Sequence, residues 1–143
     1  MKGKLKIVVP VALLIVLGGL YKVVLAKPAV DHNKVQGQVY VLPKEFLLNL
    51  ADGHFAKLDV ALVLAPGQVP AAAGGATPPD GFGALEQEAV VRDVITDIVT
   101  DASSKDLVRR KGRTALKAKV LKSLRARTDV KVNDVLFTDV AVQ

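Results

Sequence analysis

The stretch FLLNLADGHFAKLDVALVL, Phe46–Leu64, decides the fold of this chain. Its second part, Phe55–Leu64, alternates apolar and polar residues, and this period of two predicts a half-buried strand. A shorter apolar run, Phe46–Leu50, precedes it, and the Asp52-Gly53 pair between the two runs is a strong turn signal. The sequence therefore predicts a β-hairpin. The expected buried face of the longer strand consists of Leu58, Val60, Leu62 and Leu64, with Lys57 and Asp59 on the opposite face.

The region after the hairpin carries a helical pattern over residues 86–127. Ser103 followed by Asp106 resembles a capping box, which predicts the start of a second helix at this point. Gly112 is expected to interrupt or bend that second helix. Apolar residues recur at helical spacing, so each helix should bury one face. The expected buried residues are Val91, Val94, Ile95 and Ile98 in the first helix and Leu116, Val120 and Leu124 in the second.

The valine-rich tail, Val130–Gln143, is expected to form one strand with a bend near Asn133-Asp134. The predicted elements then follow the order strand, strand, helices, strand. This order predicts an α+β domain with helices packed on a small sheet. Residues 66–83 contain four prolines and five glycines, and such a stretch has little apolar surface to offset its ordering entropy. We interpret it as a flexible loop.

Length and composition limit the architecture further. The chain has 143 residues, half of them apolar, and no cysteine. The lack of cysteine excludes disulfides, thiolate zinc sites and cysteine nucleophiles. Many of the apolar residues are concentrated in Leu5–Ala26. The remainder is sufficient for one modest core and insufficient for two large domains.

The segment Leu5–Ala26 has the length and composition of a membrane-spanning helix. Its 22 residues would extend about 33 Å as a helix, and the hydrocarbon core of a bilayer is about 30 Å thick. The lysines at its N-terminal side favour a cytoplasmic N-terminus. The side chains expected in the lipid are Ile7, Val8, Val9, Val11, Leu13, Leu14, Ile15, Val16, Leu17 and Leu20.

Two other interpretations of this segment stay open. Val24-Leu25-Ala26 resembles a signal-peptide cleavage site, which would make the chain a secreted or periplasmic binding module released after Ala26. A buried core helix is the third interpretation, although three lysines among the first six residues would be unusual beside a core. The length of the apolar run favours the anchor. The predicted organisation is a cytoplasmic tail (1–4), a transmembrane anchor (5–26), a polar stalk (27–38) and an extracytoplasmic domain (39–143).

Four blocks of sequence follow the N-terminal segment in a recognisable order. They are FLLNLADGHFAKLDVALVL (Phe46–Leu64), VVRDVITDIVTD (Val90–Asp101), GRTALKAKVLKSL (Gly112–Leu124) and VLFTDVAVQ (Val135–Gln143). Together with the anchor, this series resembles the flagellar basal-body-associated FliL family. The chain departs from the family pattern at Lys119, Arg125 and Val140, where an acidic residue, an asparagine and an aromatic residue are usual.

The resemblance implies a non-enzymatic, single-pass protein of the inner membrane, located at the basal body of the bacterial flagellum. Its outer domain would be similar to the stomatin/SPFH type and would assemble into a homo-oligomeric ring. Such a ring would surround the ion-driven stator and support motor torque, motility and chemotaxis. The implied partners are therefore further copies of the chain, the stator and the lipid bilayer.

The net charge of +6 does not indicate nucleic-acid binding once it is divided by segment. Residues 1–27 hold five lysines and no acidic residue, so most of the basicity flanks the apolar segment. Residues 105–127 carry ten basic residues and one acidic residue, whereas residues 31–104 carry four basic and ten acidic residues. No aromatic residue that would stack on bases lies between Gly83 and Leu136.

The segregated charge has three interpretations. The charged helix faces are solvated, or the basic face adsorbs to anionic lipid headgroups, or the basic face of one subunit meets the acidic face of the next. A head-to-tail contact of the third kind closes into a ring where the rotation permits. The candidate interface residues are Arg109, Arg113 and Lys117 on the basic side and Asp93, Asp97 and Asp101 on the acidic side.

No catalytic or metal-binding arrangement is predicted. His32 lies in the stalk and His54 in the hairpin turn, without the helical spacing that a shared metal site would require. Asp93, Asp97 and Asp101 are four residues apart and share one helix face. Paired carboxylates suit acid–base chemistry, but a solvated acidic face is the favoured interpretation. We therefore expect no metal, no cofactor and no enzymatic activity.

Overall fold

The computed structural model describes residues 35–68 and 78–143. The predicted anchor at residues 5–26, most of the stalk and the middle of the 66–83 loop lie outside the described residues. In the described part, no helix has both the length and the apolar character needed to cross a bilayer. The elements in chain order are β1 (Gln38–Val41), β2 (Phe46–Asn49), β3 (Phe55–Leu64), α2 (Glu88–Thr100), α3 (Ser104–Val108), α4 (Arg110–Arg127) and β4 (Val132–Val142).

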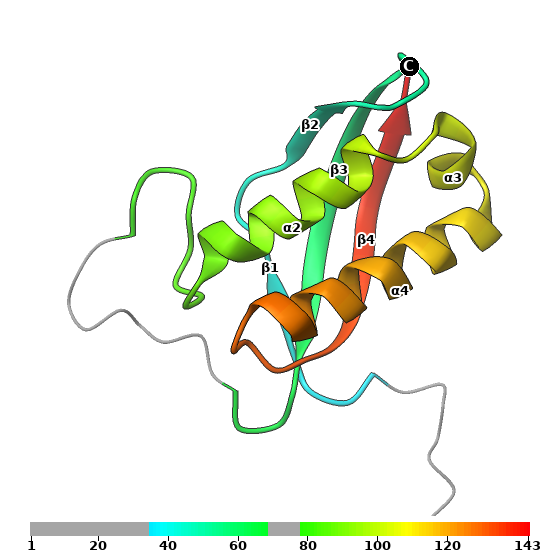
Figure 1. Ribbon diagram of the computed structural model, residues 1–143. Coiled ribbons are helices and arrows are strands. Elements are labelled where there is room, and N and C mark those ends of the chain that lie inside the picture. Colours follow the sequence, from blue (N-terminus) through cyan, green and yellow to red (C-terminus); the bar gives the residue numbers. More distant parts are fainter. Residues whose placement is uncertain (1–34, 69–77) are drawn as a thin grey trace, which may run out of the picture. The chain divides into compact units, whose positions relative to one another are not determined.

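Strand β3 is the centre of a four-stranded antiparallel sheet (Figure 1). β4 pairs with one edge of β3, while β1 and β2 follow one another along the other edge. β2 and β3 are joined through the Asp52-Gly53 turn, so the predicted hairpin is confirmed. Gly53 adopts a φ of 82° there, a conformation that glycine reaches without a steric penalty. β1 is an additional strand that the sequence analysis did not predict.

The predicted C-terminal strand is confirmed as β4, and an irregularity in its pairing lies at the position where a bend was predicted. The pairing of β4 with β3 shifts register between Val63 and Leu64, where Asn133 has no partner, and again between Asp59 and Val60. Beyond β4, Gln143 and Phe55 exchange two backbone hydrogen bonds of 2.8 and 2.9 Å. The last residue of the chain therefore extends the sheet beside the hairpin turn.

Helices α2 and α4 cover one face of the sheet (Figure 1). α2 contacts β2, α4 contacts β4, and the two helices contact each other. The predicted buried faces of the two helices are confirmed. The seven apolar residues predicted to be buried lie in one cluster with the even-numbered residues of β3. Full burial of one aliphatic side chain contributes about 1.5–3 kcal/mol, so this cluster provides most of the stability. The α+β prediction, with helices on a small sheet, is likewise confirmed.

The opposite face of the sheet differs partly from the prediction. Lys57 and Asp59 lie on it half-exposed, as expected, but Ala61 and Val63 on the same face are buried. The description of β3 as half-buried is therefore wrong for its second half. The reason is that apolar residues pair with this half from both neighbouring strands: Val39, Val41 and Leu136. The exposed large apolar residues of this face are Val39, Val41, Leu47 and Phe55.

The second predicted helix is divided at Arg109, not at Gly112. Arg109 has an extended ψ of 135°, which ends α3 and precedes α4. Gly112 lies in the first turn of α4 and packs on the backbone of Asp106, where any Cβ atom would overlap the Asp106 carbonyl. The prediction that Gly112 interrupts the helix was therefore wrong. The residue instead permits a close approach between α4 and α3.

The capping box at the start of α3 is confirmed. The backbone N–H of Ser103 and its hydroxyl both donate to Oδ2 of Asp106, at 3.0 and 2.7 Å. These bonds, the side-chain bond first, lower the pKa of Asp106 below its ordinary value. A negative charge in the first turn also interacts favourably with the helix dipole. The helix start is therefore determined by residues only three positions apart.

Candidate functional site

The acidic residues of the predicted interface form an exposed row on α2, and each contacts a cation of α4. Arg127 lies 2.8 Å from Asp93 through Nη2 and 3.4 Å from Asp97 through Nη1. Lys119 lies 3.4 Å from Asp101. All of these side chains are about half-exposed or more, and surface ion pairs of this kind contribute at most about 1 kcal/mol. An intermolecular contact would therefore displace them at little cost.

The three basic residues of the predicted interface are not equivalent. Nη1 of Arg113 donates to the carbonyls of Leu107 and Val108, at 2.9 and 2.6 Å, and so closes the C-terminal end of α3. Within residues 35–68 and 78–143, the side chains of Arg109 and Lys117 form no hydrogen bond or ion pair. Arg113 is consequently part of the α3–α4 corner, whereas Arg109 and Lys117 are available for contact with another molecule. The interface itself stays a prediction.

A second polar cluster joins the β2–β3 turn to the start of α3. Asp52 accepts hydrogen bonds from the Ser104 hydroxyl (2.7 Å) and amide (2.8 Å), which lower the pKa of Asp52 to about 2. Nδ1 of His54 lies 3.2 Å from the same carboxylate. Ser104 thus donates to the carboxylate and not to the imidazole, unlike the serine of a nucleophile–base pair.

Among the described residues, no three His, Cys, Asp or Glu side chains are grouped closely enough to hold a metal ion. His32 lies outside the described residues. The two bonds from Ser104 to Asp52 fasten the hairpin turn to the start of α3.

The sequence analysis missed a buried polar cluster at the start of α2. Glu88 is only 3% exposed. Its Oε2 accepts hydrogen bonds from the Tyr40 hydroxyl at 2.6 Å and from the Gly83 amide at 3.0 Å. Burial, followed by the bond to Glu88, raises the pKa of Tyr40 to about 12. No pattern in the sequence revealed this cluster, because Tyr40 lies 48 residues from Glu88 on a strand that was not predicted.

The residue before Glu88 has an unusual backbone conformation. Gln87 adopts a φ of 58°, and it is the only non-glycine residue with positive φ in the described part of the chain. Its amide side chain exchanges two hydrogen bonds, of 3.0 and 3.1 Å, with Asp129 in the α4–β4 connection. Left-handed backbone at such a residue carries an energetic cost that the surrounding contacts must offset. The start of α2 is thus held on both sides by contacts distant in sequence.

The fold and its surface define a small α+β domain with charged helix faces and an open sheet face that carries both exposed apolar and charged residues. A family model described as flagellar basal body-associated protein FliL matches residues 39–143. The chain therefore belongs to the FliL family of flagellar basal body-associated proteins, and the resemblance noted in the sequence is confirmed. No curated protein matches the chain.

Proposed function

We propose that this protein is a non-enzymatic, membrane-anchored subunit that forms a ring around the ion-driven stator of the flagellar motor and supports torque and motility. The family match over residues 39–143 carries this proposal. The apolar segment Leu5–Ala26, which precedes the domain in the sequence, supports an anchor in the inner membrane. The domain itself would be extracytoplasmic and similar to the stomatin/SPFH type.

The mechanism would be steric and mechanical. The anchor would hold each copy beside the stator, and the ring would enclose the outer part of the stator and favour its engaged state. The segregated charge supports a head-to-tail contact, with Arg109 and Lys117 of one copy facing the acidic row of α2 in the next. Complementary charge of this kind sets the register and rate of association more than its strength.

Residue-resolved crosslinking in motile cells tests the stator assignment. A photoreactive amino acid is placed at exposed positions of α4 in the full chain, and crosslinked products are identified by mass spectrometry. We expect crosslinks to the stator, together with crosslinks between copies of the chain. Cells that lack the stator serve as the control. The absence of any stator crosslink in motile cells would contradict the assignment.

A charge-reversal experiment tests the ring contact. Arg109→Glu with Lys117→Glu should reduce the oligomers seen by native mass spectrometry of the membrane-extracted full chain. Arg113 is left unchanged because it closes α3. Lys122→Glu with Lys131→Glu is the matched control, since it reverses two exposed charges outside the predicted interface. Equal oligomers for the two double variants would rule out the contact.

Membrane fractionation tests the anchor. The full-length chain should remain with the membrane after washing with high salt and should be released by detergent. A mature protein that begins at Lys27 and appears in the soluble fraction would contradict the anchored subunit and favour a released module.

A further inference from the structure

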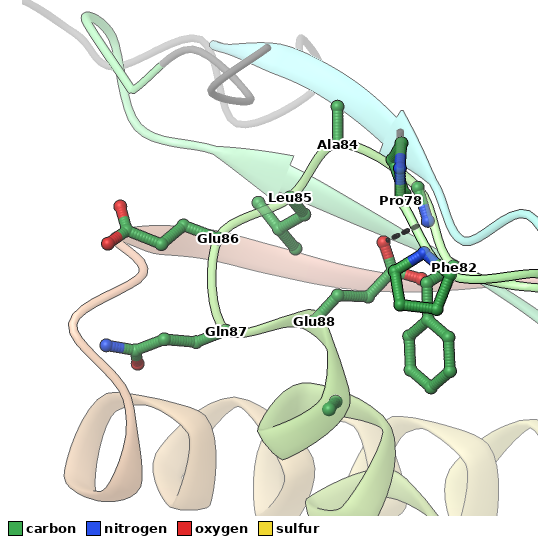
Figure 2. A pocket seen from close by; sticks show the side chains of 10 residues that line it. Pro78, Phe82, Ala84, Leu85, Glu86, Gln87 and Glu88 are labelled. Carbon is green, nitrogen blue, oxygen red and sulfur yellow. Dashed lines mark hydrogen bonds between the residues drawn. The ribbon is translucent and has the colours of Figure 1, made fainter. Parts of the chain in front are cut away.

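Two apolar surfaces of the domain differ in the charged groups that they present. One is a cavity of about 550 Å³ beside the first turn of α2, with Pro78, Phe82 and Leu85 in its wall (Figure 2). Glu88 also lines this cavity and accepts the hydrogen bond from Gly83 that the dashed line marks. Oε1 of Glu88 is fully buried, so the carboxyl group holds the start of α2 and is out of reach of a ligand.

The other surface is the face of the sheet that points away from the helices (Figure 1). The described part of the chain exposes eight large apolar side chains, and four of them lie on this face: Val39, Val41, Leu47 and Phe55. Their exposed fractions range from 41% to 58%. Apolar side chains that gather on one face, with polar groups around them, commonly mark an interaction site. The open sheet face is therefore a candidate docking surface.

Two carboxylates lie among these apolar side chains. Asp59 and Asp139 are directly opposite one another in the pairing of β3 with β4, and like charges in this arrangement destabilise a sheet. Both are accessible, since Asp59 is half-exposed and Asp139 is exposed. Neither forms an ion pair with another residue of the described ranges. The sheet thus carries a repulsive acidic pair that nothing in the described chain neutralises by direct contact.

Lys57 is the only basic residue in the four strands, and it lies on the same face. Its Nζ is 2.6 Å from Oε2 of Glu45, so this cation is already paired. The bond to Glu45 is the main cause that raises the pKa of Lys57 above its ordinary value, while Asp59 and Asp139 raise it less. The face therefore carries more carboxylates than cations, although the whole chain has a net charge of +6.

The acidic pair lies between two apolar levels of the sheet. Leu47 pairs with Lys57, two residues before Asp59. Val41 pairs with Ala61, two residues after Asp59. Two residues of a strand span about 7 Å. A partner that covers this face therefore meets an apolar, an acidic and an apolar group in turn, at steps of about 7 Å.

The negative charge limits the kind of partner. An isologous dimer applies one surface patch to itself, which here would bring the two aspartates of one copy to those of the other. A membrane surface of anionic lipids would also be repelled. A basic side chain placed at the acidic pair, in contrast, relieves the repulsion between Asp59 and Asp139.

We propose that the open sheet face docks a segment of another polypeptide that carries a lysine or arginine between two apolar side chains. The cation lies at Asp59 and Asp139, and the apolar side chains cover Leu47 and Val41. Charge complementarity of this kind selects the partner and speeds association. The proposed contact between copies of the chain involves α2 and α4, so it leaves this face free. Failure of the docking inference would therefore not affect the proposed function.

Binding of defined peptides to the purified full chain in phosphatidylcholine nanodiscs tests the proposal. The probe is a short alanine–glutamine helix with one lysine at its centre and one leucine a turn to either side. Its counterparts carry norleucine or glutamate in place of the lysine. Labelling of valine and leucine methyl groups with ¹³C makes Val41 and Leu47 local reporters by NMR, and empty nanodiscs correct for binding to lipid. We expect the lysine peptide to shift both signals and to bind about fivefold more tightly than the norleucine peptide, and the glutamate peptide to bind more weakly than either.

Asp59→Asn with Asp139→Asn is the decisive variant, because it removes both charges and retains the size of the side chains. It should reduce the preference for lysine over norleucine to less than about twofold. Asp80→Asn with Glu86→Gln is the matched control, since it removes two exposed charges outside the sheet and should leave the preference unchanged.

Val41→Thr with Leu47→Thr tests the apolar part of the surface. This variant should weaken the binding of all three peptides, followed at the methyl groups of Val39. Equal binding of the lysine and norleucine peptides to the unaltered chain would overturn the proposal, and so would a lysine preference that survives the loss of both aspartates. Signals of Val41 and Leu47 that shift with the concentration of the chain alone, and not with peptide, would overturn it in favour of a second copy.

Discussion

Helices α2 and α3 both carry a carboxylate in the first turn, and the two carboxylates are stabilised in different ways. At α3, Asp106 accepts two hydrogen bonds from Ser103, three residues away. At α2, Glu88 is buried and accepts hydrogen bonds from Tyr40 of strand β1 and from Gly83 of the loop before the helix. The helix dipole favours a negative charge at both positions. The comparison shows that the same position in a helix can be stabilised locally or only by the complete fold.

The environment of each start differs accordingly. The α3 start is only partly buried, and Asp52 of the hairpin turn accepts a hydrogen bond from its Ser104 amide. The α2 start lies against an apolar cavity and leaves one carboxyl oxygen without a partner among the described residues. When a cap near the surface is removed, water can bond to the polar groups that lose their partner. Polar groups in a buried cluster have no water to replace a lost partner. Substitutions at the α2 start should therefore have the larger effect on stability.

The largest effect is expected for Glu88→Ala. This variant leaves the Tyr40 hydroxyl and the Gly83 amide without their acceptor, and two such losses should lower the free energy of unfolding by about 3 kcal/mol. Glu88→Gln should lower it much less, because it retains an acceptor. Urea unfolding of the full chain, followed by circular dichroism, measures both. A loss no larger than that of Asp106→Ala would contradict the ranking of the two helix starts.

A smaller loss is expected for Gly112→Ala. Replacement of glycine by alanine inside a helix usually stabilises by about 1 kcal/mol. Here the added methyl group would overlap the backbone of Asp106, so we expect a net loss of about 2 kcal/mol. The same unfolding assay gives the sign. Ala126→Gly, at an exposed position of the same helix, supplies the ordinary propensity difference for comparison, and a stabilised Gly112→Ala variant would show that α3 moves away freely.

Removal of the local cap has a moderate effect. Ser103→Ala eliminates the hydroxyl that donates to Asp106 and should reduce the free energy of unfolding by about 1 kcal/mol. Ser103→Thr retains a hydroxyl and should recover most of this loss. If Ser103→Ala were as damaging as Glu88→Ala, the distinction between a local and a buried helix start would not hold.

The pH dependence of the α3 start should be the smallest of these effects. The pKa of Asp52 is held at about 2, below its ordinary value of 3.8, mainly by the Ser104 hydroxyl and amide. Because the folded pKa is depressed, this contribution to stability is complete above about pH 4 and is lost as the pH falls toward 2. Asp52→Asn should therefore flatten the decrease of the melting temperature between pH 4 and 2. Asp80→Asn is the exposed control and should retain the decrease.

Short-range patterns in the sequence predicted most of the fold. The hairpin, the buried faces of α2 and α4, the capping box and the C-terminal strand each depend on residues within a few positions of one another. β1 escaped prediction because it has only four residues, and none of them is buried. The break at Arg109 escaped because no breaking residue marks it, and Gly112 drew attention to the wrong position.

The charged surface was predicted from composition, and the tertiary structure changed its interpretation. The sequence separates a basic from an acidic segment, and this separation suggested contact between subunits. Packing of α4 beside α2 also brings Arg127 to Asp93 and Asp97 within one chain. Arg109 and Lys117 remain available for contact with another molecule. Arg113 differs from them because its side chain donates to backbone carbonyls at the end of α3.

The sequence by itself determined the class of the domain, its family and its apolar faces, because periodicity, turn signals and capping are properties of neighbouring residues. Only the tertiary structure decided that Glu88 is buried against Tyr40, that Gly112 permits a close approach and that a cavity lies beside the start of α2. Each of these depends on which distant residues meet after folding. An acidic residue in a first turn looks alike in either setting, and only the folded chain shows that Glu88 is buried whereas Asp106 is partly exposed.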